Sequence, residues 1–142
     1  MERTLIEKIK EKTGQQIKVA GFVHTIRDQG SIKFLIIRDI SGVIQVVITR
    51  ASAEALKIAE SLSLESVVEI IGLAKAEKQA PGGIEVAAEK ISILSSVPSD
   101  LPIPVVEKGN GEVDLQKRLD WRWLDLRKPE KAFVFKVWTL ME

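Results

Sequence analysis

The sequence contains no cysteine and only one histidine, His24, among its 142 residues. Without cysteine the chain has no disulfide framework, no thiolate nucleophile and no cysteine-based metal site. A lone histidine likewise excludes a metal site built from several histidines. Motifs typical of metalloproteases, serine hydrolases, P-loop proteins and dinucleotide-binding proteins are also missing. We therefore expect no catalytic residue and no metal site in this chain.

Long hydrophobic runs and an excess of one charge are missing as well. No apolar stretch approaches the roughly 20 residues of a transmembrane helix. The first residues, MERTLIEKIKEK, lack the apolar core of a signal peptide, so we expect a cytoplasmic protein. The formal net charge of +1 excludes a strongly polycationic protein but allows a local basic patch that contacts nucleic acid.

The hydrophobic pattern predicts five strands and one helix. Hydrophobic residues make up 45% of the chain and charged residues 29%, which is typical of a globular protein. Strand patterns cover residues 16–26, 31–39 and 42–49, with short connections between them. Helical spacing over 52–63 predicts a helix of about three turns with Ser52 as its N-cap. Two further strands are predicted over 66–78 and 82–94.

This order of elements matches the OB-fold, a five-stranded Greek-key barrel whose single helix lies between strands three and four. We therefore predict a mainly β OB-fold domain over residues 1–104, which begins with a short amphipathic segment over 1–12. A small α+β sandwich is the competing architecture.

The end of the chain differs in composition. Residues 95–114 hold three of the five prolines, which is typical of an extended linker. Residues 117–136 carry seven basic and three acidic side chains, and the segment 115–142 holds all three tryptophans. We interpret residues 105–128 as a linker or hinge and 129–142 as the start of a helix that docks on another element.

Two residues in the predicted second and third strands are candidates for nucleic-acid binding. An OB-fold binds nucleic acid on these strands, with aromatic rings that stack on bases. Phe34 lies in a strand that is apolar on both faces, so it is either a core residue or such a ring. Gln45 interrupts an apolar run, so it either points into solvent or hydrogen-bonds a base beside Phe34.

The run GFVHTIRDQGSIKFLIIRDISGVIQVVI resembles the signature of the anticodon-binding domain of class II aspartyl-, asparaginyl- and lysyl-tRNA synthetases. Residues 64–94 are similar to the family's fourth and fifth strands. The segment RLDWRWLDLRKPEKAFVFK resembles its hinge and the first helix of its catalytic domain. The spacing is most similar to the archaeal aspartyl branch, so the resemblance implies the N-terminal portion of such an enzyme.

The resemblance also implies roles for individual residues. Phe34 would lie under the middle anticodon base, a uridine, and Gln45 would read the edge of that base. Arg27, in the loop after the first strand, and Glu85, at the start of the fifth, would contact the third base. An ordinary surface ion pair is the alternative for these two residues. Lys33 is a candidate for a phosphate contact.

Two departures from the family pattern bear on tRNA specificity. Aspartate-selective archaeal members tend to carry Trp in the first strand and Lys in the loop before the fifth, where this chain has His24 and Pro81. This pairing resembles members that charge both tRNA(Asp) and tRNA(Asn), whose anticodons GUC and GUU differ only at the third base. A surface histidine and a simple turn former are the alternatives. We interpret Arg38 and Asp39 as structural residues that hold the hairpin.

For the whole enzyme, the resemblance implies ATP- and Mg²⁺-dependent activation of aspartate, transfer to tRNA(Asp) and tRNA(Asn), and a homodimer formed mainly by the catalytic domain. This chain lacks that domain, so we expect it to bind tRNA without catalysis and without a cofactor of its own. The alternatives are a domain of an asparaginyl-tRNA synthetase or a paralogue, a generic OB-fold module that binds single-stranded nucleic acid, and a dimerisation domain.

Overall fold

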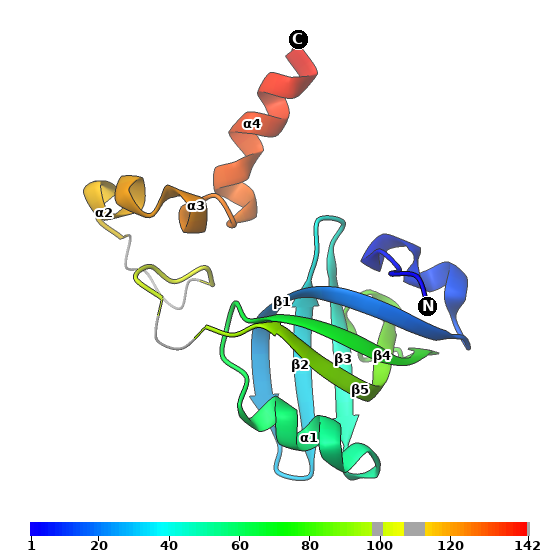
Figure 1. Cartoon of the computed structure of the whole chain (residues 1–142). Coiled ribbons are helices and arrows are strands. Elements are labelled where there is room, and N and C mark those ends of the chain that lie inside the picture. The colour runs from blue at the N-terminus through cyan, green and yellow to red at the C-terminus, as the bar shows by residue number, and fades with distance from the viewer. Residues whose placement is uncertain (98–100, 107–112, 142) are drawn as a thin grey trace. The chain divides into compact units, whose positions relative to one another are not determined.

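Five strands close into a barrel in a computed structural model that describes residues 1–97, 101–106 and 113–141 (Figure 1). The order around the barrel is β1-β2-β3-β5-β4. Neighbouring strands are antiparallel, except that β3 and β5 are parallel. The bounds are Gln16–Asp28 for β1, Ile32–Arg38 for β2, Val43–Thr49 for β3, Val67–Ala76 for β4 and Ile84–Ser95 for β5. The closed barrel confirms the predicted OB-fold and excludes the sandwich.

The helix between β3 and β4 is shorter than predicted. The 3-10 turn η2 covers Arg50–Ser52 and the helix α1 covers Ala53–Glu60. Ser52 occupies the N-cap position, as predicted, but its hydroxyl makes no capping bond and donates a 2.9 Å hydrogen bond to the carbonyl oxygen of Ala88 instead. Ala55 and Ala59 face the core, and the helix ends where the Ser61 N–H bonds the Ile58 carbonyl.

Alternating side chains on the strands fill the barrel. Ile17, Val19 and Val23 of β1 point inward, and the core continues through the buried residues of the other strands. The N-terminal segment forms the 3-10 helix η1, Ile6–Lys12, whose Ile6 and Ile9 join this core, so the predicted amphipathic lead-in is confirmed.

Gly21 lies where the backbones of two strands come too close for any side chain. A Cβ atom at Gly21 would lie 2.3 Å from the Arg38 carbonyl oxygen. Glycine at this position therefore lets β1 coil tightly against β2 and close the barrel.

One residue of β1 breaks the alternation of faces. Val23 pairs with Ile37 and Thr25 pairs with Ile36, so His24 is an extra residue, a β-bulge. After the bulge, Ile26 packs against the core and Arg27 faces outward. The first strand also continues through Asp28, so Arg27 lies in a strand and not in the predicted loop.

The chain divides into two compact units, Met1–Pro98 and Ser99–Glu142. The barrel lies in the first unit, whereas the predicted domain extended to residue 104. In the second unit, α2 covers Leu115–Asp120, α3 covers Arg122–Asp125 and α4 covers Pro129–Met141. Two short helices thus lie in the predicted linker, and residues 98–100, 107–112 and 142 of the predicted segments lie outside the described residues.

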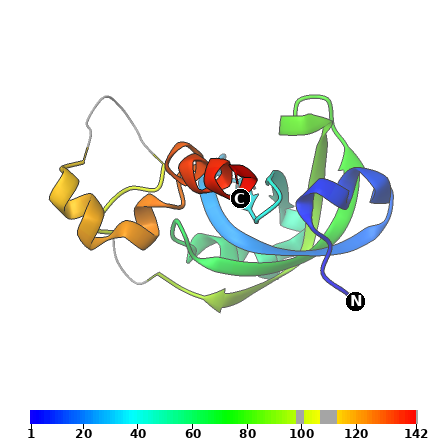
Figure 2. The ribbon, with the colours of Figure 1, turned by 90° about the horizontal axis from the view of Figure 1, so that it is seen from above.

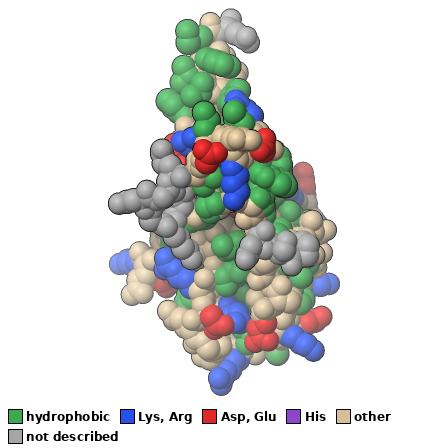
Figure 3. Space-filling model, turned by 90° about the vertical axis from the view of Figure 1, so that its left-hand side faces the viewer, with side chains coloured by type: hydrophobic (Ala, Val, Ile, Leu, Met, Phe, Trp, Pro, Cys, Tyr) green, Lys and Arg blue, Asp and Glu red, His purple; other side chains and the backbone are tan. Residues whose placement is uncertain are grey.

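The helices α2 and α3 are held by a small cluster within the second unit. Ile103, Val105 and Leu124 are buried together, and the Arg118 guanidinium binds the Asp125 carboxylate at 3.1 Å. The helix α4 begins at Pro129, as predicted, and it exposes apolar side chains, which are visible in green in Figure 3. Among the described helices, none is long and apolar enough to cross a membrane.

Candidate nucleic-acid interface

The strand register gathers four of the predicted site residues on the outside of the barrel. Phe34 pairs with Arg27 of β1 on one side, and two residues further along β2, Ile36 pairs with Gln45 of β3. Gln45 in turn pairs with Glu85 of β5. We call Arg27, Phe34, Gln45 and Glu85 the binding face.

The structure settles the orientation of Phe34. Its chain neighbours Lys33 and Leu35 are buried on the inside of the barrel, so the Phe34 ring lies on the outside and is half-buried. Ile32 and Ile36 flank it on the same side of β2. The core interpretation of Phe34 is therefore wrong.

Gln45 and Glu85 form a hydrogen-bonded pair beside this ring. The Gln45 amide nitrogen Nε2 donates to the Glu85 oxygen Oε2 at 3.1 Å. Both side chains are half-buried on the outside of the barrel. The bond holds the amide so that its carbonyl oxygen stays available as an acceptor, and Glu85 adds a negative charge to the face.

Arg27 and Glu85 lie at opposite edges of the binding face. The strands β2 and β3 separate them, which corresponds to three strand spacings, or up to about 14 Å. Among the described residues no ion pair joins Arg27 and Glu85, since Arg27 lies beside Phe34 and Glu85 beside Gln45. That both contact the same base stays a prediction.

Lys33 is placed inside the barrel, not on the binding face. It is 5% exposed, and its ammonium group forms an ion pair with Asp28, its partner in the β1–β2 register. Hydrogen bonds from Lys33 and from the Gly30 N–H lower the pKa of Asp28. Since the ammonium group is engaged at this end of the barrel, Lys33 does not fit the predicted phosphate contact.

His24 belongs to a second polar cluster. Its Nδ1 atom lies 3.0 Å from Nη1 of Arg38, and Nη2 of Arg38 donates to Oε2 of Glu65 at 2.9 Å. The Arg38 guanidinium also lies 5.4 Å from the centre of the Phe22 ring. We call Phe22, His24, Arg38 and Glu65 the arginine cluster.

The charge of this cluster favours a neutral histidine. Partial burial lowers the pKa of His24, the nearby Arg38 charge lowers it further, and Glu65 partly opposes the shift. A neutral ring accepts the Arg38 N–H at Nδ1, which a protonated ring could not do. His24 is therefore a structural partner of Arg38 and not a freely solvated surface histidine.

Glu65 was missed in the sequence analysis. It is 3% exposed, and its backbone has a positive φ of 65°, which is rare for a residue other than glycine. No local pattern marks it, because its partner Arg38 is distant in the sequence. Asp39, by contrast, holds the hairpin as predicted, since its Oδ1 accepts the backbone N–H groups of Ser41 and Gly42.

Pro81 lies exposed in the turn before β5. It begins the 3-10 turn η3, Pro81–Gly83, four residues before Glu85. The structure does not bring His24 and Pro81 together, because β2 and β3 lie between β1 and β5 on one side of the barrel and β4 lies between them on the other. In the described ranges, no group of three or more His, Cys, Asp or Glu residues is arranged to hold a metal ion.

Residues 17–94 match the family described as the OB-fold nucleic acid binding domain of the tRNA anticodon type. The chain belongs to this family. It is 44% identical over 123 residues to the aspartate–tRNA(Asp/Asn) ligase of Methanoculleus marisnigri. These residues make up 85% of this chain and 28% of that protein. The enzyme of the same name from Sulfurisphaera tokodaii is 42% identical over 130 residues, or 92% of this chain and 30% of the relative.

The chain is also similar to a solved structure of this synthetase group. Asparaginyl-tRNA synthetase from Pyrococcus horikoshii, in complex with asparaginyl-adenylate, is 31% identical with a TM-score of 0.83. The match covers 96% of this chain and 31% of that one. The chain thus spans about 30% of the length of its relatives, and its resemblance to the anticodon-binding domains of this synthetase group is confirmed.

Proposed function

We propose that this chain is the anticodon-binding domain of an aspartate–tRNA(Asp/Asn) ligase. The observation that carries the proposal is the outward Phe34 ring with Gln45 and Glu85 on the neighbouring strands. A ring beside hydrogen-bonding groups suits an unpaired base, which stacks on the ring and presents its Watson–Crick edge. The names of the curated relatives support tRNA as the source of that base.

In this proposal, Phe34 stacks under the middle anticodon base. Gln45 reads the edge of that base: its Nε2 is held by Glu85, so its carbonyl oxygen accepts the N3–H of a uridine. Glu85 lies at one edge of the face, toward the third anticodon base. Arg27, at the other edge, supplies a positive charge toward the RNA.

The domain accepts both GUC and GUU anticodons in this proposal. Discrimination between C and U needs groups that favour one base or penalise the other. His24 is engaged with Arg38, and Pro81 has no side-chain donor, so neither adds such a group near the third base. The relatives named as acting on tRNA(Asp/Asn) support this relaxed specificity.

The test is a binding titration of this chain at fixed salt against three anticodon stem-loops that carry GUC, GUU or GAA. Near-equal affinity for GUC and GUU, with weaker binding of GAA, is expected. Selective binding of GUC alone would contradict the relaxed specificity but keep the aspartate assignment. Equal binding of all three would leave only a generic OB-fold that binds single-stranded nucleic acid.

A domain of an asparaginyl-tRNA synthetase is the second candidate, because the chain is also similar to the enzyme from Pyrococcus horikoshii. Selective binding of GUU in the same titration would favour it.

The whole protein is proposed to be a cytoplasmic, homodimeric ligase that joins aspartate to tRNA with ATP and Mg²⁺. The chain covers only 28% of the relative from Methanoculleus marisnigri, so in this proposal the catalytic activity belongs to the remainder of such an enzyme. Joining this chain to the catalytic domain of a relative and assaying aspartylation of both tRNAs would test the assignment.

A further inference from the structure

The loop between α1 and β4 holds β1 at the point where that strand carries its bulge. The Val23 N–H donates to the Ser66 carbonyl oxygen at 2.8 Å, and the Glu65 N–H donates to the Val23 carbonyl oxygen at 2.7 Å. The loop therefore lies against β1, which curves around the barrel in Figure 2. Because Val23 directly precedes the extra residue His24, the loop fixes β1 immediately before the bulge.

Glu65 has a backbone conformation that favours glycine. Two loop residues, Glu65 and Ser66, face the single strand residue Val23, and in such an arrangement the first residue is usually a glycine with a positive φ. The φ of Glu65 is 65°, a conformation that brings a Cβ atom close to the following carbonyl oxygen. Residues held in this conformation gather at functional sites. A glutamate in a position that suits glycine indicates that its side chain is used.

The Glu65 side chain reaches the bulge through Arg38. Its Oε2 atom accepts a hydrogen bond from Nη2 of Arg38 at 2.9 Å, and Nη1 of Arg38 lies 3.0 Å from Nδ1 of His24. The Glu65 carboxylate is almost fully buried, and hydrogen bonds between charged groups are stronger than those between neutral ones. One loop residue thus binds β1 through its backbone and, through Arg38, contacts the bulged residue as well.

The bulge decides which side chains of β1 face the RNA. Beyond it, Ile26 packs against the core, and Arg27 is exposed beside its register partner Phe34. Strict alternation along the strand would place these two residues of β1 on the opposite sides. Contacts that hold the bulge therefore also hold Arg27 on the binding face.

We propose that Glu65 is a positioning residue for RNA binding, which fixes the bulge of β1 and thereby the place of Arg27 on the binding face. Glu65 is 3% exposed, so it acts through the strand and not by contact with RNA. This inference rests on the proposed function. It divides the binding face in two, because Arg27 depends on Glu65, whereas Phe34 is held by the pairing of β2 with β3.

A double-mutant cycle tests this role. E65G removes the carboxylate, and glycine accepts the positive φ without strain. The affinity for the GUC stem-loop is measured for the wild type, E65G, R27A and E65G/R27A, at a temperature where circular dichroism shows each variant to be folded. Independent residues have additive effects, whereas residues in one network are coupled. We expect R27A to weaken binding by a factor at least about threefold smaller in E65G than in the wild type.

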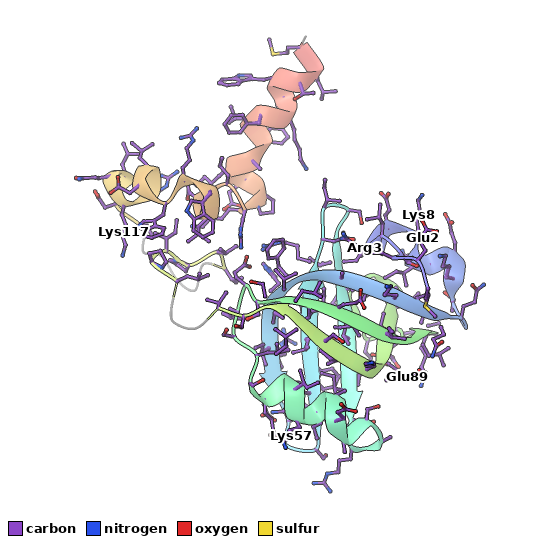
Figure 4. All side chains as sticks on the ribbon, in the orientation of Figure 1. Glu2, Arg3, Lys8, Lys57, Glu89 and Lys117 are labelled. Atoms are coloured by element: carbon purple, nitrogen blue, oxygen red, sulfur yellow. The ribbon has the colours of Figure 1, made fainter. Side chains whose placement is uncertain are left out.

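Two controls separate positioning from a general loss of stability. F34A should weaken binding by the same factor in E65G and in the wild type. D39A removes a second buried carboxylate, which accepts the N–H groups of Ser41 and Gly42 and pairs with Arg3, marked in Figure 4. D39A should lower the melting temperature and keep the full effect of R27A. If E65G does not fold, E65Q, which removes only the charge, replaces it in the same cycle with the same expectation.

An equal effect of R27A in E65G and in the wild type would overturn the proposal, because Glu65 would then only stabilise the fold. A smaller effect of R27A in D39A would also overturn it, since any loss of stability would then produce the coupling. So would a smaller effect of F34A in E65G, or no effect of R27A in the wild type. If the wild type binds GUC, GUU and GAA equally but R27A loses its effect only in E65G, the anticodon proposal fails and the positioning role stands. No RNA binding by the wild type would overturn both.

Discussion

The binding face and the arginine cluster lie on neighbouring parts of the same barrel wall, yet they use polar side chains in opposite ways. In the arginine cluster, Arg38 contacts His24, Glu65 and Phe22 at once. On the binding face, Gln45 and Glu85 share one hydrogen bond beside an outward ring. Polar groups with several protein partners hold the strands together, whereas polar groups that keep unused donors or acceptors are suited to binding a ligand.

The largest expected effect comes from breaking the arginine cluster. Arg38→Ala removes the guanidinium from a Glu65 carboxylate that is almost fully buried, and breaking a buried ion pair costs about 3–5 kcal/mol. Some water reaches Arg38, so we expect a loss of about 3 kcal/mol in the free energy of unfolding, measured by urea denaturation. Arg27→Ala, on the exposed end of β1, is the control and should change stability by less than about 0.5 kcal/mol. Equal losses in the two variants would remove the distinction between the regions.

Breaking the binding face should affect binding and leave the fold intact. Stacking of one base on an aromatic ring contributes about 1–3 kcal/mol, so Phe34→Ala should weaken binding of the GUC stem-loop about 5- to 150-fold. The melting temperature should change little, because Phe34 lies outside the core. Leu94→Ala removes another exposed apolar side chain, at the end of β5, and should bind RNA normally. An unchanged affinity in Phe34→Ala would contradict the stacking role.

A smaller effect on base preference is expected at one of two chemically similar Gln–Glu pairs and not at the other. Gln45 donates to Glu85 on the binding face, and Gln16 donates to Glu89 elsewhere on the barrel. Gln45→Ala should reduce the preference for GUC over GAA about fivefold or more, because it removes the hydrogen bond to the middle base. Gln16→Ala should leave that preference unchanged. The binding titration with the GUC and GAA stem-loops measures both variants. A loss of preference in Gln16→Ala would show that base preference does not depend on the position of the Gln–Glu pair.

The smallest expected effect is the contribution of His24, in the arginine cluster, to the pH dependence of the free energy of unfolding. The pKa of His24 in the folded chain is lowered below the ordinary value of 6.5, so the unfolded chain takes up a proton first as the pH falls. The stability contributed by neutral His24 is therefore complete above about pH 6.5 and declines as the pH falls toward the lowered pKa. Denaturant unfolding of the wild type and His24→Gln between pH 7.5 and 5 should show a steeper decline for the wild type. Parallel curves would mean that His24 protonates freely in the folded state.

Much of the barrel could be predicted from the sequence, because strand alternation and turn residues are local signals. The five strands, the intervening helix and the apolar lead-in at Ile6 and Ile9 follow from such patterns. The resemblance to the synthetase family indicated Phe34 and Gln45, where alternation alone left both faces of β2 equally apolar. The placement of Lys33 inside the barrel was not predictable, because it depends on pairing with Asp28 across the β1–β2 register.

Other features depended on distant contacts. Glu65 is defined by its ion pair with Arg38, and Ser52 bonds Ala88 on another strand instead of capping its own helix. The two short helices α2 and α3 lie within residues 105–128, which were interpreted as a linker or hinge. They are stabilised by packing of Leu124 against Ile103 and Val105, which precede them in the chain.

The bulge at His24 also makes the length of β1 a determinant of function. Strict alternation from Val23 would turn Ile26 toward solvent and Arg27 toward the core, and the extra residue His24 reverses the side of both. Insertions and deletions are usually tolerated at loop tips, but here a second residue inserted next to His24 would exchange the two sides of the strand beside Phe34. Within this strand, the count of residues carries as much information for RNA binding as their identity.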